Sequence, residues 1–194
     1  MKATFTGLWS IGVVVLIGAI SIAGLWARTE SARYRVIEKD GKIEIREYAA
    51  HVVATTSMTG AGENGSFGRL FQYISGENAA NEKIAMTTPV FMPATLDGRA
   101  TEMQFVVPSS VASAGAPQPS SRRVSLKTMS GGRYAAIRYN GRSNSKVQKA
   151  KLGELRAYLK AEGVSVRGNP IFAGYDPPWT PAPMRRNEIL LRIN

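Results

Sequence analysis

The sequence has no cysteine and only one histidine, His51, among its 194 residues. Without cysteine the chain has no thiol nucleophile, and its redox compartment cannot be inferred. It also lacks a G-x-S-x-G motif, a P-loop and a cluster of metal-ligating side chains. No serine partner for His51 can be identified from the sequence. These absences argue against an enzyme, and we expect no catalytic residues and no metal site.

Charge is absent from Ala3 to Ala27. Within this stretch, Leu8–Trp26 is predominantly apolar and is long enough as a helix to cross a bilayer core. Trp9 and Trp26 lie near its ends, where interfacial aromatic residues are common. We therefore expect residues 1–30 to form an N-terminal membrane anchor. A cleaved signal peptide is the alternative, but the apolar run is longer than usual for one and no clean cleavage site follows it.

The orientation of this anchor is ambiguous. Lys2 lies on one side of the apolar run, whereas Arg28, Arg33 and Arg35 lie on the other. The count of positive charges favours a cytoplasmic domain, whereas the short N-terminal tail with its lysine is typical of an exported protein. We expect the domain on the exported, periplasmic side, with the cytoplasmic side as the alternative.

Acidic residues are few: 14 Asp and Glu stand against 25 Lys and Arg, which gives a formal charge of +11. Such an excess suits an anionic partner such as an acidic lipid or a carboxylate ligand, although a solvated basic surface would have the same composition. The basic residues are scattered, and no basic stripe carries the aromatic residues that stack on bases. We therefore expect no nucleic-acid partner. The oligomeric state cannot be predicted.

Two segments have the spacing of amphipathic helices. In the first, an apolar stripe runs from Phe67 to Ile74, with Ser66 as the expected N-cap and Gly76 as the expected end. The second spans Ser145–Glu162 and begins with the spacing of a capping box. Strands are expected at residues 34–48 (a hairpin around an Asp-Gly turn), 51–58, 84–93, 101–108, 124–129, 133–139, 169–178 and 187–193.

The order strand, helix, strand, strand occurs twice, at residues 51–108 and 133–193. The final strand of each copy opens on a glutamate, so Glu102 and Glu188 occupy equivalent positions. We therefore expect an α+β fold in residues 31–194. Its duplicated β-α-β-β unit should form a distorted antiparallel barrel with two flanking helices, in addition to the N-terminal transmembrane helix.

Several segments together resemble the SOUL haem-binding protein family, from about Tyr34 to the C-terminus. They are YRVIE, IEIREY, FGRLFQYISGEN, EKIAMTTPV, and AGYDPPWTP followed by RRNE. The resemblance implies a duplicated β-α-β-β barrel related to bacterial effector-binding domains. It also implies binding of haem or another porphyrin in an open apolar groove beside the first helix, and we expect this binding to be weak because this chain departs from the family pattern. Glu47, Gln72 and Thr180 stand where branches of the family carry a histidine and two lysines.

The expected groove would use side chains from the first helix and from the proline-rich loop before the last strand. The same helix stripe could instead be a core face, and the loop could be only a rigid corner. Arg185 and Arg186 could bind carboxylates, or they could pair with Glu188 or Asp176. The candidate tetrapyrrole-binding residues are Phe67, Leu70, Phe71, Ile74, Trp179, Arg185 and Arg186.

Other side chains have more ordinary interpretations. His51 is expected to be a surface or capping residue rather than an iron ligand, and Met86 and Met92 are expected to fill gaps in the core.

The one enzymatic alternative is a small-molecule effector-binding domain or hydrolase that uses Glu102 or Glu188. Burial would raise the pKa of such a glutamate and make it a general base, unless arginines pair with it. We expect a non-enzymatic tetrapyrrole-binding or carrier protein.

Overall fold

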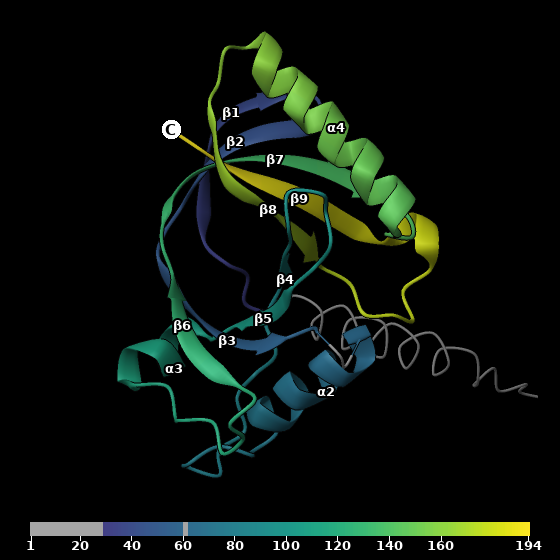
Figure 1. Cartoon of the computed structure of the whole chain (residues 1–194). Helices are drawn as coiled ribbons and strands as arrows, with labels where there is room; N and C mark the ends of the chain where they lie inside the picture. The colour runs from purple at the N-terminus through teal and green to yellow at the C-terminus, as the bar shows by residue number, and fades with distance from the viewer. Residues whose placement is uncertain (1–28, 60–61) are drawn as a thin grey trace, which may run out of the picture.

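The computed structural model describes residues 29–59 and 62–194, so the predicted anchor lies almost entirely outside them. In the described part, nine antiparallel strands form one strongly curved sheet (Figure 1). The strands are β1 (Tyr34–Asp40), β2 (Ile43–Tyr48), β3 (His51–Ser57), β4 (Val90–Pro93), β5 (Glu102–Val106), β6 (Ser125–Met129), β7 (Gly132–Asn140), β8 (Val166–Gly174) and β9 (Arg186–Ile193). The helices are α2 (Gly62–Ile74), α3 (Ser109–Ala114), α4 (Ser145–Ala161) and the 3-10 turn η1 (Ala182–Met184). Within residues 29–59 and 62–194, no helix has the length and apolar character needed to cross a membrane.

The strand order confirms the predicted duplication. The sheet runs β1-β2-β7-β9-β8-β4-β5-β3-β6. The unit β3-α2-β4-β5 contributes the run β4-β5-β3, and the unit β7-α4-β8-β9 contributes β7-β9-β8. These two runs mirror each other about the pairing of β8 with β4, as two copies related by a pseudo-two-fold axis require.

The two halves also exchange a strand. β2 precedes β3 along the chain but pairs with β7, whereas β6 precedes β7 but pairs with β3. The glycines between β6 and β7 therefore form a crossing rather than the turn that the sequence predicted. At this crossing the backbone runs so close to β2 that a Cβ on Gly131 would lie 2.7 Å from the Tyr48 carbonyl oxygen. Only glycine fits such an approach.

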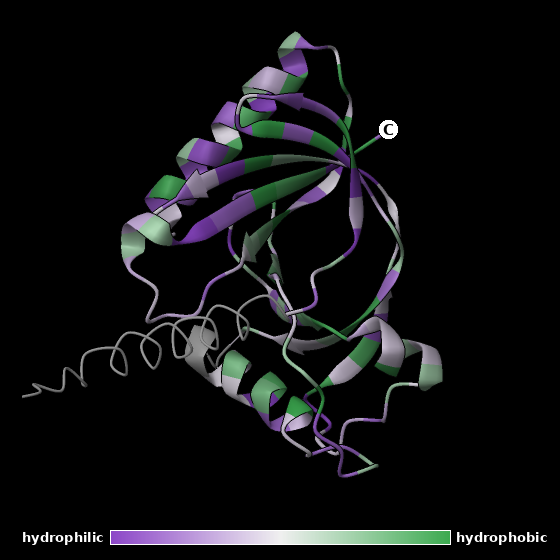
Figure 2. Ribbon diagram, turned by 180° about the vertical axis from the view of Figure 1, so that it is seen from behind, coloured by the Kyte–Doolittle hydropathy of each residue, from purple (hydrophilic) through white to green (hydrophobic). Residues whose placement is uncertain are grey.

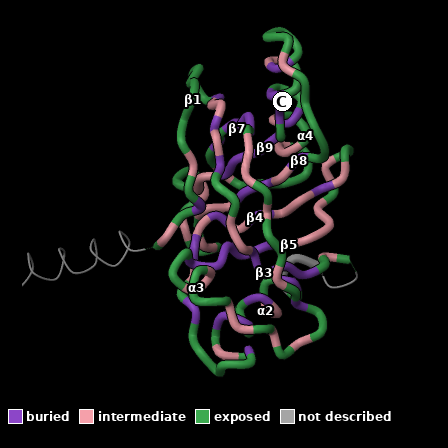
Figure 3. Tube along the Cα trace, turned by 90° about the vertical axis from the view of Figure 1, so that its left-hand side faces the viewer, coloured by how far each residue is buried: buried purple, intermediate pink, exposed green. Residues whose placement is uncertain are grey.

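The N-terminal hairpin is confirmed. β1 and β2 pair around Asp40 and Gly41, and Gly41 has a φ of 54°. This left-handed conformation is the one that an Asp-Gly turn supplies at little steric cost. β1 pairs only with β2 and is exposed along nearly its whole length (Figure 3).

Apolar residues alternate with polar ones along the strands (Figure 2), and the apolar side chains form three clusters. Leu152, Leu155 and Leu159 of α4 cover the outer face of the second half of the sheet. Leu70 and Tyr73 of α2 cover the outer face of the first half. A third cluster fills the inner, concave face. The fold therefore has two helix-covered outer surfaces and one enclosed inner surface.

The predicted ends of the helices need correction. α2 begins at Gly62, so Ser66 lies inside the helix, where its hydroxyl donates to the Ser57 carbonyl. α4 is capped by Asn144, whose side chain accepts the Val147 N–H, rather than by Ser145. An asparagine one residue earlier offers the same kind of acceptor, so the sequence alone did not distinguish the two caps.

Two loop segments also differ from the prediction. Residues 84–89 are not a strand, because their backbone groups bond outside the sheet: Ile84 N–H donates to Ile74 O, and Thr88 exchanges hydrogen bonds with Glu30 and Ala32. The short helix α3 lies at the start of the segment 109–123, which was predicted to be a loop. Its small polar residues gave no amphipathic signal.

Candidate functional site

A row of residues on the outer face of the sheet forms a floor between α2 and the proline-rich loop. Val90 of β4 pairs with Phe105 on one side and with Gly174 on the other, and Gly174 pairs with Asn187. A Cβ at Gly174 would meet no described atom within 4 Å. Phe105 in this row is buried, Val90 is half-buried, and the row is open above Gly174, where β8 ends and the loop begins.

The flank of α2 beside this floor carries two exposed aromatic rings. Phe67 and Phe71 are 39% and 51% exposed, and their rings lie nearly parallel with centroids 6.1 Å apart. Phe67 also packs edge-on against Phe105, at 5.1 Å. Leu70 and Ile74, in contrast, are buried in the core. The predicted stripe is thus divided, because two of its residues hold the helix on the sheet and two face solvent beside the floor.

The loop 175–185 leaves β8 next to this floor and returns into β9. Arg185 braces it from within, because its guanidinium donates to the carbonyl of Thr180 at 2.8 Å and to that of Pro178. This arrangement agrees with the rigid-corner interpretation of the loop. Trp179, however, is 76% exposed, so the corner does not use the indole for packing. Its exposed indole is available for a ligand.

Arg186 lies on the inner face of the sheet, away from this floor. Its guanidinium pairs with Glu188 at 2.7 Å and lies 3.9 Å from the centroid of the Tyr175 ring. Its backbone N–H donates to the Asp176 carboxylate. Arg186 was expected either to bind a ligand carboxylate or to pair with Glu188 or Asp176, and in the structure it forms the ion pair with Glu188. Carboxylate binding by Arg185 or Arg186 stays a prediction and would require each to exchange its present partners.

Glu188 is the centre of a buried polar cluster. Its carboxylate receives two hydrogen bonds from Arg46, at 2.6 and 2.9 Å, and one from the Tyr175 hydroxyl, at 2.8 Å. Burial alone would raise the pKa of Glu188, but the hydrogen bonds and charges of Arg46 and Arg186 outweigh it, and the pKa is lowered. The enzymatic alternative requires a glutamate with a raised pKa, and Glu188 does not meet this requirement. The predicted pairing of Glu188 with arginine is confirmed.

Arg46 and Tyr175 also belong to this cluster, and the sequence did not predict them there. The alternation of residues in β2 could have predicted this position for Arg46. Ile43 and Ile45 face α4, so Arg46 points to the opposite, inner face. Arg46 is 1% exposed, a degree of burial that a charged side chain tolerates only with partners.

Glu102, the equivalent of Glu188, has a weaker environment. It pairs with Lys127 at 2.8 Å and accepts from the Thr55 hydroxyl at 3.1 Å. Burial tends to raise its pKa, but these partners and Gln104 lower it on balance. The expected arginine partner is thus replaced by a lysine, and Glu102 also stays an ionised carboxylate.

His51 lies on the opposite face of the sheet from the exposed phenylalanines. Its ring stacks on Phe91 of the inner cluster, and Nδ1 is 3.0 Å from the Ala49 carbonyl, to which it donates. Nε2 is buried and has no hydrogen-bond partner among the described residues. Burial lowers the pKa of His51, so the ring is neutral near pH 7. His51 cannot reach a ligand above Val90 without crossing the sheet.

We tested whether the side chains around this floor suit a haem. The paired phenylalanines and the open position at Gly174 suit a flat apolar macrocycle. Met86 and Met92 are partly buried against the α2 core, as predicted for gap-filling residues, and they supply thioether sulfurs on this face. Glu47 is held by Arg35 at the surface, at 2.7 Å. The site thus fits the ring system better than it fits strong iron ligation.

Comparison with known proteins gives a family and a fold. The model of the family described as "SOUL heme-binding protein" matches residues 29–192. The C-terminal domain of EcmrR has a TM-score of 0.57 at 10% identity, covering 83% of this chain and 98% of that domain. A hydrolase from Listeria innocua has a TM-score of 0.57 at 11% identity, covering 90% and 98%. A comparison with curated protein sequences gives no match. These solved structures share the fold, and the chain belongs to the SOUL heme-binding protein family.

Proposed function

We propose that this domain binds haem or another porphyrin on the outer face of the sheet, as a non-enzymatic binding or carrier protein. The ligand would lie between the α2 flank and the loop 175–185, in a slot floored by Val90 and Gly174. The observation that carries the proposal is the exposed, nearly parallel pair Phe67 and Phe71 beside this floor. Family membership supplies the class of ligand.

In this slot, Phe67 and Phe71 would cover one side of the ring, and the Trp179 indole could pack on it from the loop. A bound haem would bring iron with its capacity for redox change and for binding small ligands. The chain's own contribution is an apolar surface that removes the macrocycle from water. Because the slot is open, we propose that binding is weak and tolerates different porphyrins.

A hydrolase or effector-binding role for the inner-face glutamate is less well supported. A general base needs a carboxylate that can take up a proton near neutral pH. Glu188 is instead held ionised by Arg46 and Arg186, and its lowered pKa leaves it a poor base. The likeness to a hydrolase at 11% identity concerns the fold alone.

We further propose that the chain is held at a membrane by its N-terminal segment, with the domain on the exported side. The anchor rests on the charge-free stretch from Ala3 to Ala27, and the orientation rests on the short N-terminal tail with Lys2. A reporter fused to the C-terminus, active only outside the cytoplasm, tests the orientation in cells. A fusion protein that is produced but whose reporter stays inactive would overturn this part of the proposal.

Titration of the purified protein with haemin and with metal-free protoporphyrin tests the ligand proposal. We expect a shifted Soret band that saturates, and Phe71→Ala should weaken binding about three- to tenfold by removing one ring contact. The matched control is Ile37→Ala, which removes apolar surface of similar exposure (42%) from the edge strand β1. Failure of both ligands to bind, or an equal effect of the two substitutions, would overturn the proposed site.

A further inference from the structure

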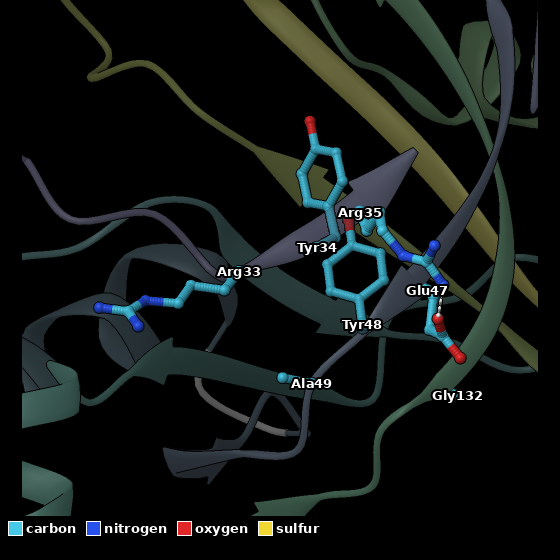
Figure 4. A pocket seen from close by; sticks show the side chains of 7 residues that line it. All are labelled: Arg33, Tyr34, Arg35, Glu47, Tyr48, Ala49 and Gly132. Atoms are coloured by element: carbon cyan, nitrogen blue, oxygen red, sulfur yellow. Dashed lines mark hydrogen bonds and ion pairs between the residues drawn. The ribbon is translucent and has the colours of Figure 1, made fainter. Parts of the chain in front are cut away.

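A cavity lies where β1 begins and β2 ends, away from the proposed porphyrin slot. It has a volume of about 430 Å³ and is lined by Arg33, Tyr34, Arg35, Glu47, Tyr48, Ala49 and Gly132. Arg33 extends at one end and the Arg35–Glu47 pair lies at the other, with the two tyrosine rings between them (Figure 4). The tyrosine ring centroids are 5.0 Å apart. The cavity thus has aromatic walls and arginines at both ends.

One more arginine lies against the lining residue Gly132, and another lies opposite it on the neighbouring strand. A Cβ at Gly132 would lie 3.2 Å from Arg192 Nη2, so this guanidinium covers the glycine that lines the cavity. Arg192 of β9 lies directly opposite Arg167 of β8 in the sheet register. Like charges placed opposite each other across neighbouring strands repel, and the repulsion is relieved when an anion lies between them.

The positive charge here is largely unneutralised. Glu47 pairs with Arg35 and is also within electrostatic reach of Arg133. For Arg33, Arg167 and Arg192, residues 29–59 and 62–194 provide no carboxylate within ion-pair distance. Arg192 donates only to the neutral carbonyl of Gly131, at 3.1 Å. Of Arg33, Arg35, Arg133, Arg167 and Arg192, only Arg35 thus forms an ion pair among the described residues.

We propose that this arginine-rimmed cavity binds a phosphate group. A phosphate offers three oxygens in different directions, so it can accept hydrogen bonds from guanidinium groups on separate strands, whereas one carboxylate matches a single guanidinium fork. Arg33 lines the cavity, and the Arg192 guanidinium lies against its lining residue Gly132. Tyr34 and Tyr48 form a wall for whatever the phosphate is attached to. The group can belong to a soluble phosphate or to a lipid headgroup, which share this chemistry.

The test uses the full chain in a non-ionic detergent and calorimetric titration with inorganic phosphate, dihexanoyl phosphatidic acid and dihexanoyl phosphatidylcholine. We expect at least one of the first two to bind, and Arg33→Gln and Arg192→Gln each to weaken that binding about tenfold. Arg192→Lys should restore only part of the loss, because lysine keeps the charge without the fork.

The matched control is Lys149→Gln, which removes one charge from the exposed face of α4. It should leave phosphate affinity unchanged, and all variants should keep the wild-type affinity for porphyrin, because the two sites share no residue. Preference for phosphatidic acid would identify a lipid source, and preference for inorganic phosphate a soluble one. Absence of binding to both, or an equal loss in Lys149→Gln, would overturn the proposal.

Discussion

Arg46 on β2 binds Glu188 on β9 through two hydrogen bonds of 2.6 and 2.9 Å, across the intervening strand β7. Both side chains are buried, at 1% and 0% exposure. β2 belongs to the first half of the chain but pairs with β7 of the second half, to which β9 also belongs. This ion pair therefore links β2 to the half of the sheet with which it pairs. Glu188 is one of the two glutamates that the enzymatic alternative would use, and this ion pair holds it.

Replacing Arg46 with alanine should lower the free energy of unfolding by about 3–5 kcal/mol, because Glu188 would lose its main partner in a buried position. Urea denaturation followed by circular dichroism measures the change. The matched control is Arg35→Ala, which breaks an exposed pair with Glu47 and should have little effect. Similar losses in both variants would mean that the buried pair has no special structural role.

The ion pair of Arg46 with Glu188 predicts that the unfolding free energy falls at low pH. The pKa of Glu188 is lowered in the folded protein from an ordinary value of 4.5, so its contribution is fully present above about pH 4.5. That contribution is lost as the pH falls through the folded pKa. Unfolding free energies measured between pH 7 and pH 3 should therefore fall less steeply for Glu188→Gln than for the wild type. Parallel curves would contradict this assignment.

His51→Ala should leave the Soret band of a bound haem nearly unchanged. The ring of His51 stacks on Phe91 on the inner face, whereas Phe67 and Phe71 lie on the outer face. Absorption spectra of haem-loaded wild type and variant test this directly. A large loss of the ligand-field bands in the variant would show that His51 ligates the iron and that the ligand lies elsewhere. Phe91→Leu is a useful companion, because it alters the same inner contact without removing an imidazole.

Two residues of the loop 175–185 should affect different properties, Trp179 the binding of porphyrin and Arg185 the stability of the protein. Trp179→Ala should weaken porphyrin binding about three- to tenfold with little change in melting temperature, because the indole is 76% exposed. Arg185→Ala should lower the melting temperature, because its guanidinium braces the Thr180 carbonyl. Comparing porphyrin dicarboxylates with their esters tests whether Arg185 also binds carboxylates. A selective loss of the acids would support that role, and an equal loss would limit Arg185 to the loop.

Sequence patterns predicted much of this fold because the duplicated order of elements and the Asp-Gly hairpin are local signals. Strand exchange was not predictable, since the alternation in β2 and β6 shows which face of a strand is buried but not which strand lies beside it. For the same reason the sequence correctly indicated a partner for Glu188 but did not identify Arg46, which is 142 positions away.

The candidate site was predicted less completely than the fold. Helical spacing placed Phe67, Leu70, Phe71 and Ile74 on one stripe, but it did not show that β3 and β5 would bury two of them and leave the other two beside an open floor. That division depends on how far the helix extends over the sheet, which is a tertiary property. Residues facing β3 and β5 become core, and those on the flank stay exposed.

Truncation tests the boundary between the predicted anchor and the domain. Removal of residues 1–28 should leave a folded protein, because the nine strands of the sheet and the three core clusters are built from residues that follow them. Glu30 accepts the Thr88 N–H through its carbonyl and the Ser109 N–H through its carboxylate, and Ala32 N–H donates to Thr88 O. Removal of residues 1–33 should therefore lower the unfolding free energy, by about 0.5–1.5 kcal/mol for each hydrogen bond lost. Urea denaturation of the two truncated proteins compares them. Failure of the shorter deletion to fold, or equal stability of the two, would contradict a domain that begins at Glu30.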